Sequence, residues 1–334
     1  MPSPDETILT GLAEGTVVPF LGPGALQGVI EPVGGKPIPA DSNSLILAMN
    51  NGAPMAPKLM FEFSRAAMHV ELKRGRAAVR KFLDATYRDT HWSPSPLHQW
   101  LAEQAPGYIV DCNRDLFLQR AWAARPHILI VGVARMAGNE YRFNIYLHDG
   151  AAYRAIDQEE ADVTLPILFK PVGTPLPESS YIASDADFVD YLTELMGGFA
   201  IPGFVKRMRQ GRRYLLLGMR FNRDTERMLL SEIAFGADKP AGWALIPNPS
   251  DKERRFLERL NFEIVSADVA DFLEAAMIAV NSRASRVRSA FTASSPKPAS
   301  SKSSNQYWHS SASSSTTPIF ATNSARDRAL QAAR

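Results

Sequence analysis

The stretch Val17-Val18-Pro19-Phe20-Leu21-Gly22-Pro23-Gly24-Ala25 is the segment on which the interpretation of the fold rests. An apolar run that ends in two glycines separated by one residue is typical of a buried strand followed by a tight turn. Glycine has no Cβ, so the backbone can adopt positive φ there and a ligand can approach closely. Backbone N–H groups left bare beside a helix N-terminus then favour a phosphate. This pattern alone also fits an ordinary turn, so other segments of the chain are needed to distinguish a phosphate-binding loop from a turn.

The composition is that of a globular protein. Of the 334 residues, 45% are hydrophobic and 22% are charged, and the formal net charge is +2. A chain of this length can bury a substantial core. A net charge so close to zero gives no electrostatic argument for nucleic acid or a membrane surface as the main partner, so we expect neither.

The single cysteine, Cys112, excludes an internal disulfide and a zinc ribbon, and it is expected to be a small buried thiol. The first residues lack the basic and apolar regions of a signal peptide, and no apolar run reaches membrane-spanning length. We therefore expect a cytoplasmic protein that holds no zinc or other metal.

Strand-like apolar runs and helical patterns alternate through most of the chain. The strand-like runs are residues 16–21, 108–110, 164–169, 214–218, 243–246 and 263–265. This alternation predicts an α/β fold, a Rossmann-like parallel sheet with helices on both faces. Three further runs in residues 127–156 are separated by the hairpin-turn pairs Gly138-Asn139 and Asp149-Gly150. They predict a small antiparallel β insertion within about residues 127–160.

The helical patterns and the tail complete the organisation. Helices are expected in residues 58–87 with a break at Gly75, and in 97–104, 116–124, 185–196, 225–234, 251–260 and 268–280. Near Phe291 the composition changes to Ser, Ala, Thr, Lys and Pro, with few apolar residues to bury. We expect residues 286–334 to form a disordered Ser-rich tail, and residues 1–285 to form one domain.

Three loops that follow predicted strands carry residues suited to nucleotide binding. They are Gly22-Pro23-Gly24-Ala25, Asp111-Cys112-Asn113-Arg114-Asp115 and Gly218-Met219-Arg220-Phe221-Asn222-Arg223-Asp224. Loops at the carboxyl ends of parallel strands meet at one edge of a sheet, where such folds bind ligands. Asn and Asp grip ribose hydroxyls or orient a water, although both residue types also cap helices. We interpret the set as a nucleotide site.

These motifs resemble those of the sirtuin family, specifically its bacterial branch that lacks the zinc ribbon. Residues 20–26 are similar to the family's Gly-Ala-Gly signature, with Pro23 in the middle position, and 111–115 are similar to Thr-x-Asn-x-Asp, with Asp111 in place of Thr. Residues 217–224 are similar to the branch's late Gly-x-Ser-x-x-Asp loop. The resemblance extends over residues 12–280 and includes the helix before residue 108 and the last strand and helix.

The family's remaining signature, Lys-Leu-His-Gly, falls on Lys170-Pro171-Val172-Gly173. In the family the His is the general base on the nicotinamide-side ribose, and Val172, which stands in its place, can neither accept a proton nor bond a hydroxyl. His98 and His127 are the nearest substitutes along the chain, and His98 is expected to pack within its helix. Asp111 either repels phosphate or, with a raised pKa, replaces the base, and both outcomes stay open.

The resemblance implies a sirtuin-like nucleotide-binding domain in residues 1–285 that binds NAD as substrate or ligand. It assigns cofactor binding to Gly22, Pro23, Gly24, Ala25, Asn113, Asp115, Gly218, Asn222 and Asp224, and catalysis to Asn113 and Asp115. Arg114, Arg220 and Arg223 offset the acidic charge if they point inward. Branch members without the zinc ribbon are implied to hydrolyse NAD, often in antiphage defence, rather than to deacylate lysine.

Two functions stay open at this point. The first is an NAD glycohydrolase-like enzyme that breaks the nicotinamide–ribose bond, with catalysis impaired or lost because of Val172. The second is a catalytically inactive nucleotide sensor or scaffold that acts through a protein partner or as a homo-oligomer. The motifs predict NAD binding better than they predict catalysis.

Overall fold

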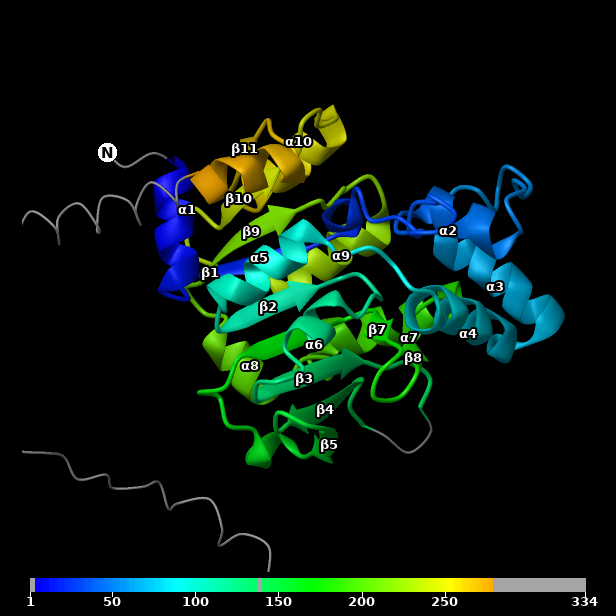
Figure 1. The fold of residues 1–334 in the computed structure, drawn as a ribbon, viewed down its shortest axis with the longest axis horizontal. Coiled ribbons are helices and arrows are strands. Elements are labelled where there is room, and N and C mark those ends of the chain that lie inside the picture. The colour runs from blue at the N-terminus through cyan, green and yellow to red at the C-terminus, as the bar shows by residue number, and fades with distance from the viewer. Residues whose placement is uncertain (1–3, 137–139, 279–334) are drawn as a thin grey trace, which may run out of the picture. The chain divides into compact units, whose positions relative to one another are not determined.

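The glycine motif follows an inner strand of a nine-stranded sheet with the order β11-β10-β9-β1-β2-β6-β3-β4-β5 (Figure 1). The strands are β1 (Val17–Leu21), β2 (Tyr108–Asp111), β3 (His127–Gly132), β4 (Phe143–His148), β5 (Tyr153–Ile156), β6 (Ile167–Lys170), β9 (Arg213–Leu217), β10 (Gly242–Leu245) and β11 (Phe262–Val265). From β11 to β3 every neighbouring pair is parallel, and β4 and β5 continue the sheet in antiparallel pairing. The predicted parallel sheet is therefore confirmed.

The computed structural model describes residues 4–136 and 140–278, which belong to the unit Met1–Ser285. The expected Ser-rich tail, residues 286–334, and the Gly138-Asn139 turn lie outside the described residues. None of the helices in the described ranges combines the length and the apolar character needed to cross a bilayer.

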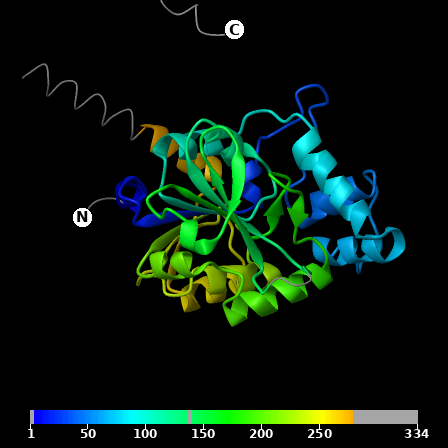
Figure 2. The same cartoon turned by 90° about the horizontal axis from the view of Figure 1, so that it is seen from below.

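Both faces of the sheet are covered by helices, which explains the continuously apolar strands. On one face, Phe20 and Leu216 pack in a core with residues of α7 (Asp185–Gly197), α8 (Gly203–Met208), α9 (Asp224–Ile233) and α10 (Asp251–Arg259). On the other face, Leu21 and Leu217 pack with α1 (Pro4–Ala13), α5 (Pro96–Gln104), α6 (Phe117–Ala121) and the helical residues 269–278. Figure 2 shows the helices on the two sides of the sheet.

A helical module lies beyond the carboxyl ends of the strands (Figure 1). It consists of α2 (Ser42–Met49), α3 (Phe63–Arg74), α4 (Arg76–Asp84) and the turn Ala85–Asp89. The predicted break at Gly75 is confirmed, because this glycine separates α3 from α4 with φ +81°. The module has its own core, which includes Ile46 and Phe63 and extends to Tyr181 of the β7–β8 hairpin (Gly173–Thr174, Ser180–Tyr181). It therefore covers the sheet edge on which the three motif loops lie.

The antiparallel insertion is confirmed, and it is continuous with the main sheet. β3 pairs antiparallel with β4 from His127 opposite His148 to Gly132 opposite Phe143. The other edge of β3 pairs parallel with β6, with Ile128 opposite Ile167. The meander thus extends the parallel sheet beyond β6, while the parallel pairing of β6 with β2 places the segment after β6 next to the segment after β2. The helices α1, α2 and α8 were not predicted.

Candidate functional site

The glycine loop packs directly on the loop that follows β9. The N–H of Gly22 donates to the carbonyl of Leu217 at 2.9 Å, and the N–H of Gly24 donates to the carbonyl of Gly218 at 2.8 Å. A Cβ on Gly24 would lie 2.7 Å from the Cα of Gly218. A Cβ on Gly218, whose φ is +70°, would lie 2.4 Å from the backbone nitrogen of Ala25. These glycines are required because two backbones touch, an approach that no Cβ allows.

The expectation that this turn leaves backbone N–H groups bare is wrong for the glycine loop. Gly22 and Gly24 donate to the β9 loop, and the N–H of Ala25 donates to the carbonyl of Gly22 at 2.9 Å. Pro23 has no N–H to offer. The loop therefore shapes the site, and positive charge for a phosphate has to come from side chains.

The loop after β2 lies underneath the glycine loop and is bonded to it. The side-chain amide of Asn113 donates to the carbonyl of Gly22 at 2.9 Å, and its backbone N–H donates to the Asp111 carboxylate at 2.9 Å. Asp115 accepts from the N–H of Phe117 at 2.8 Å. Asn113 and Asp115 are only 4% and 2% exposed. Asn113 and Asp115 are therefore buried residues that stabilise the conformation of this loop.

Asp111 is paired with the lysine of the fourth motif. The ammonium of Lys170 lies 2.6 Å from the Asp111 carboxylate and donates to the carbonyl of Asp115 at 2.9 Å, with both side chains buried. Burial raises the pKa of Asp111, while the Lys170 charge opposes that rise. Because Asp111 faces Lys170 and is fully buried, we assign it to the support of the loops.

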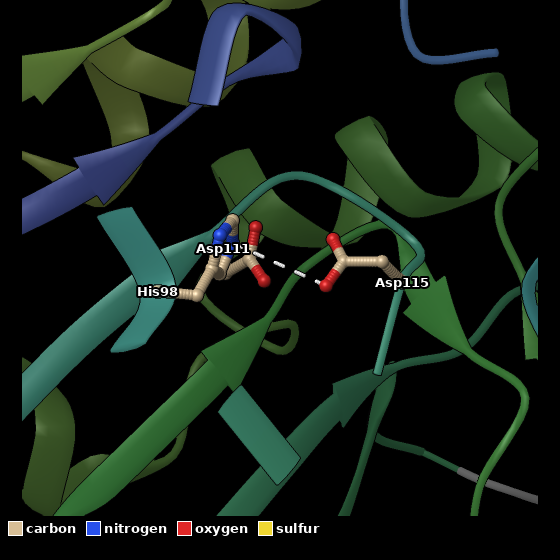
Figure 3. A group of neighbouring side chains, drawn as sticks. All are labelled: His98, Asp111 and Asp115. Carbon is tan, nitrogen blue, oxygen red and sulfur yellow. Dashed lines mark ion pairs between the residues drawn. The ribbon is translucent and has the colours of Figure 1, made fainter. Parts of the chain in front are cut away.

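His98, Asp111 and Asp115 form a buried polar cluster (Figure 3). His98 Nε2 lies 4.0 Å from Asp115 Oδ1, and its Nδ1 lies 2.6 Å from the Ser95 hydroxyl. Burial opposes the ionisation of Asp115, but the nearby charges of Lys170 and His98 and the N–H of Phe117 hold its pKa below the usual value. Three ligand-type atoms lie within 4.8 Å of one another. Lys170 supplies a cation to the Asp111 carboxylate and a hydrogen bond to the Asp115 carbonyl, so Asp111 has a positive partner without a metal ion.

A small inner cavity of about 80 Å³ brings the four motifs together. It is lined by Pro23 of the first motif, Cys112 and Arg114 of the second, Val172 of the fourth and Met219 of the third. Burial raises the pKa of the Cys112 thiol, which keeps it protonated, in agreement with the expected inert cysteine. Val172 is buried at the wall of this cavity, at the position that the resemblance assigns to the family's base.

A larger outer cleft of about 580 Å³ adjoins the inner cavity. The two spaces share the residues Pro23, Ala40, Ser42, Met219 and Glu226. The cleft continues past the β9 loop to Pro247 and Asp268, beyond β10 and β11. Its volume lies within the range of ligand pockets, about 300–1,000 Å³.

The predicted site residues divide into three groups. Those that line the cleft are Pro23, Gly24, Gly218 and Asn222. Those that lie beneath it in the loops are Gly22, Ala25, Asn113 and Asp115. Asp224 does not line either space, and its side chain, 86% exposed, pairs with Arg227.

The three arginines of the motif loops differ in what they bind. Arg220 is held by two bonds to the Glu253 carboxylate, at 2.9 and 3.0 Å, and Arg114 donates to the carbonyl of Ile182 at 2.6 Å. The Arg223 guanidinium lies over the Phe61 ring at 4.4 Å. Within residues 4–136 and 140–278 it has no carboxylate partner and no hydrogen bond. Arg223 therefore lines the cleft with a cation that is free to meet an anionic ligand.

Glu226 and Glu62, which line the inner cavity, were missed by the sequence analysis. Glu226 stands in the first turn of α9, where an acidic residue is usual for a helix start. Glu62 directly precedes α3. Only the packing of the helical module against the sheet places Glu62 beside α9, so no local sequence signal could have found this pair.

Comparison with known protein families agrees with this geometry. Residues 108–265 match the SIR2-like domain family. No curated protein matches the chain. The matched region contains the loop after β2, Val172 and the loop after β9, and β1 with its glycine motif pairs with strands of that region on both sides. Residues 108–265 of the chain therefore carry a SIR2-like domain.

Proposed function

We propose that this protein binds NAD, or a related dinucleotide such as ADP-ribose, in the outer cleft. The nicotinamide-side ribose faces the inner cavity, and the adenosine half extends towards Pro247 and Asp268. The observation that carries the proposal is the convergence of four separate motifs on two joined spaces. The match to the SIR2-like domain over the same loops supports the choice of NAD.

The pyrophosphate requires a cation, and Arg223 is its proposed partner. The N–H groups of Gly22, Gly24 and Ala25 are bonded within the protein. Arg220 is held by Glu253, and Arg114 lines the inner cavity. Arginine binds phosphate oxygens through several donors at once. The charge of Arg223 is therefore the principal attraction for the ligand phosphates.

The same geometry favours binding over fast turnover. Val172 removes the family's base, and the proposed catalytic residues Asn113 and Asp115 are buried and bonded to the backbone. Cleavage of the nicotinamide–ribose bond, as in an NAD glycohydrolase, is then slow. If turnover is absent, the alternative function is a nucleotide sensor or scaffold that acts through a protein partner or as a homo-oligomer.

Calorimetric titration of the full chain with NAD and with ADP-ribose tests the binding proposal. We expect saturable binding of both, and a loss of roughly 10-fold or more in affinity for Arg223→Ala, because a charge-assisted bond contributes about 1.5–3 kcal/mol. The matched control is Arg259→Ala, which also removes an arginine stacked on a phenylalanine, Phe256, but at the end of α10 and outside the lining of both spaces. No binding of either ligand to the wild-type chain would refute the proposal.

Release of nicotinamide from NAD, followed by chromatography, separates the two functions. Slow release marks an NAD glycohydrolase-like enzyme, whereas binding without release marks a sensor. The role in antiphage defence implied by the family resemblance is a separate proposal. It is tested by the plating efficiency of phages on cells that express the wild-type chain or Arg223→Ala.

A further inference from the structure

Glu226 lies at the junction of the two spaces. It lines both the outer cleft and the inner cavity, and of the five residues that they share it alone has an ionisable side chain. The junction separates the large space, which fits the body of a dinucleotide, from the small space beside Val172. A ligand whose ribose faces the inner cavity would present its anomeric carbon near this carboxyl group.

The carboxyl of Glu226 is not committed to any strong partner. It accepts one long bond, 3.4 Å, from the backbone N–H of Arg223, and no ion pair holds it within the described residues. By contrast, Glu62 accepts from the Thr225 hydroxyl, and Glu253 is held by Arg220. Of these three neighbouring acids, Glu226 is the one free to exchange a proton with a ligand or a water.

The surroundings of Glu226 raise the pKa of its carboxyl group above the value in water. Burial is the main cause that raises its pKa, to about 8. The N–H and charge of Arg223 lower it, while the carboxylates of Glu62 before α3 and Glu253 on α10 raise it. On the β2 side the cavity presents Cys112, whose thiol stays protonated, and Arg114. The group therefore changes charge near neutral to mildly alkaline pH, the range that suits a general base.

We propose that Glu226 is the general base for hydrolysis of the nicotinamide–ribose bond, in place of the histidine that Val172 replaces. The proposal rests on NAD binding in the outer cleft. A water forms a bond to the anomeric carbon while the bond from that carbon to the ring nitrogen breaks. The electron pair of the broken bond neutralises the pyridinium, so nicotinamide leaves uncharged. The proton of the water moves to the Glu226 carboxylate and later passes to solvent through the outer cleft.

The test measures nicotinamide release from NAD by the full chain between pH 6 and 9.5. Wild-type activity should rise with pH through an apparent pKa near the value for Glu226, about 8. Glu226→Gln should lower the rate by about 10²–10⁴-fold, the usual contribution of a general base. The variant should still bind NAD, since glutamine has nearly the same shape.

Two companion variants separate catalysis from structure. Glu62→Gln removes a negative charge near Glu226 and so should lower the pKa of Glu226. The rise of the rate with pH should then occur at lower pH. Glu232→Gln, on the same helix but outside both spaces, should leave the profile unchanged.

Stability provides a readout that needs no activity. The folded-state pKa of Glu226 lies above its ordinary value of 4.5, so its contribution is fully present below pH 4.5 and is lost as pH rises through about 8. The urea midpoint of the wild type should therefore fall over this range relative to that of Glu226→Gln. Parallel midpoints would contradict the raised pKa.

The outcomes are distinct from those of the binding proposal. If the wild type binds NAD but releases no nicotinamide at any pH, the assignment of Glu226 as a base is wrong and NAD binding stands. The assignment also fails if the rate of Glu226→Gln still rises with pH through about 8 as that of the wild type does. If the wild type does not bind NAD, the proposed function itself fails.

Discussion

The side-chain amide of Asn113 donates to the main-chain carbonyl of Gly22 at 2.9 Å, and so joins the loop after β2 to the glycine loop after β1. The two residues are 91 positions apart in the chain. Both are buried beneath the cleft that we assign to NAD. A residue of the family's catalytic motif thus supports the wall of the site in this protein.

Asn113→Ala should weaken both folding and NAD binding. It leaves the buried Gly22 carbonyl without its donor, which costs about 1–3 kcal/mol, and it frees the glycine loop to move. Asn222→Ala is the control for stability alone, because Asn222 lines the cleft but is exposed, so its loss should change stability by less than about 0.5 kcal/mol. Urea denaturation and NAD titration measure the two effects. Unchanged stability and affinity in Asn113→Ala would contradict this role.

The buried pair of Asp111 and Lys170 should show strong coupling. Asp111→Asn or Lys170→Met alone leaves one buried charge without its partner and should destabilise the fold by about 3–5 kcal/mol. The double variant should lose much less than the sum of the two. A double-mutant cycle of unfolding free energies checks this, and additive losses would show that the 2.6 Å contact contributes nothing.

Gly218→Ala should be far more harmful than Gly28→Ala, although both glycines have positive φ and both line the cleft. At Gly28 the new methyl group meets open space, so only the conformational cost of about 1–2 kcal/mol applies. At Gly218 it would lie 2.4 Å from the Ala25 nitrogen and force the two loops apart. Thermal melts and NAD titration of the two variants test this order. Equal losses would argue against close contact of the loops.

His127 should make the fold sensitive to acid. It is fully buried, with Nδ1 2.9 Å from the Arg125 carbonyl and Nε2 2.8 Å from the Tyr153 hydroxyl. Burial lowers its pKa from 6.5 to about 4, so its contribution to stability is complete above pH 6.5 and is lost as pH falls towards 4. His127→Phe should therefore cost less stability at pH 4.5 than at pH 7. Equal costs at both pH values would refute the assignment.

Val172→His should increase the release of nicotinamide by adding an imidazole base to the inner cavity, which Glu226 also lines. The side chain lies at the wall of the inner cavity, which gives the larger ring space. A well-placed base contributes about 10²–10⁴-fold, so a measurable gain is expected, with a pH profile shifted towards that of histidine. Val172→Asn, which is polar but not basic, is the control. NAD binding without any gain in release would show that the base is not what limits the reaction.

Much of the fold could be predicted because local patterns carry it. Apolar runs such as Tyr214–Leu217 are buried on both faces, and helix signals such as Ser184 before α7 depend on neighbouring residues only. The strand order and the continuity of β3 with β6 could not be predicted, since pairing between distant segments leaves no local signal. The position of the helical module over the sheet edge could not be predicted for the same reason.

The sequence by itself determined that glycines stand after the first strand, that the other sirtuin-like motifs each follow a strand, and that valine stands where the resemblance expects histidine. Only the tertiary structure decided what those residues do. It turned the glycine N–H groups towards the β9 loop, buried Asn113 and Asp115, and left Arg223 and Glu226 facing the cleft. The physical reason is that the identity of a residue sets the chemistry it can offer. The residues that distant segments place next to it decide whether its polar groups are bonded within the protein or can bind a ligand.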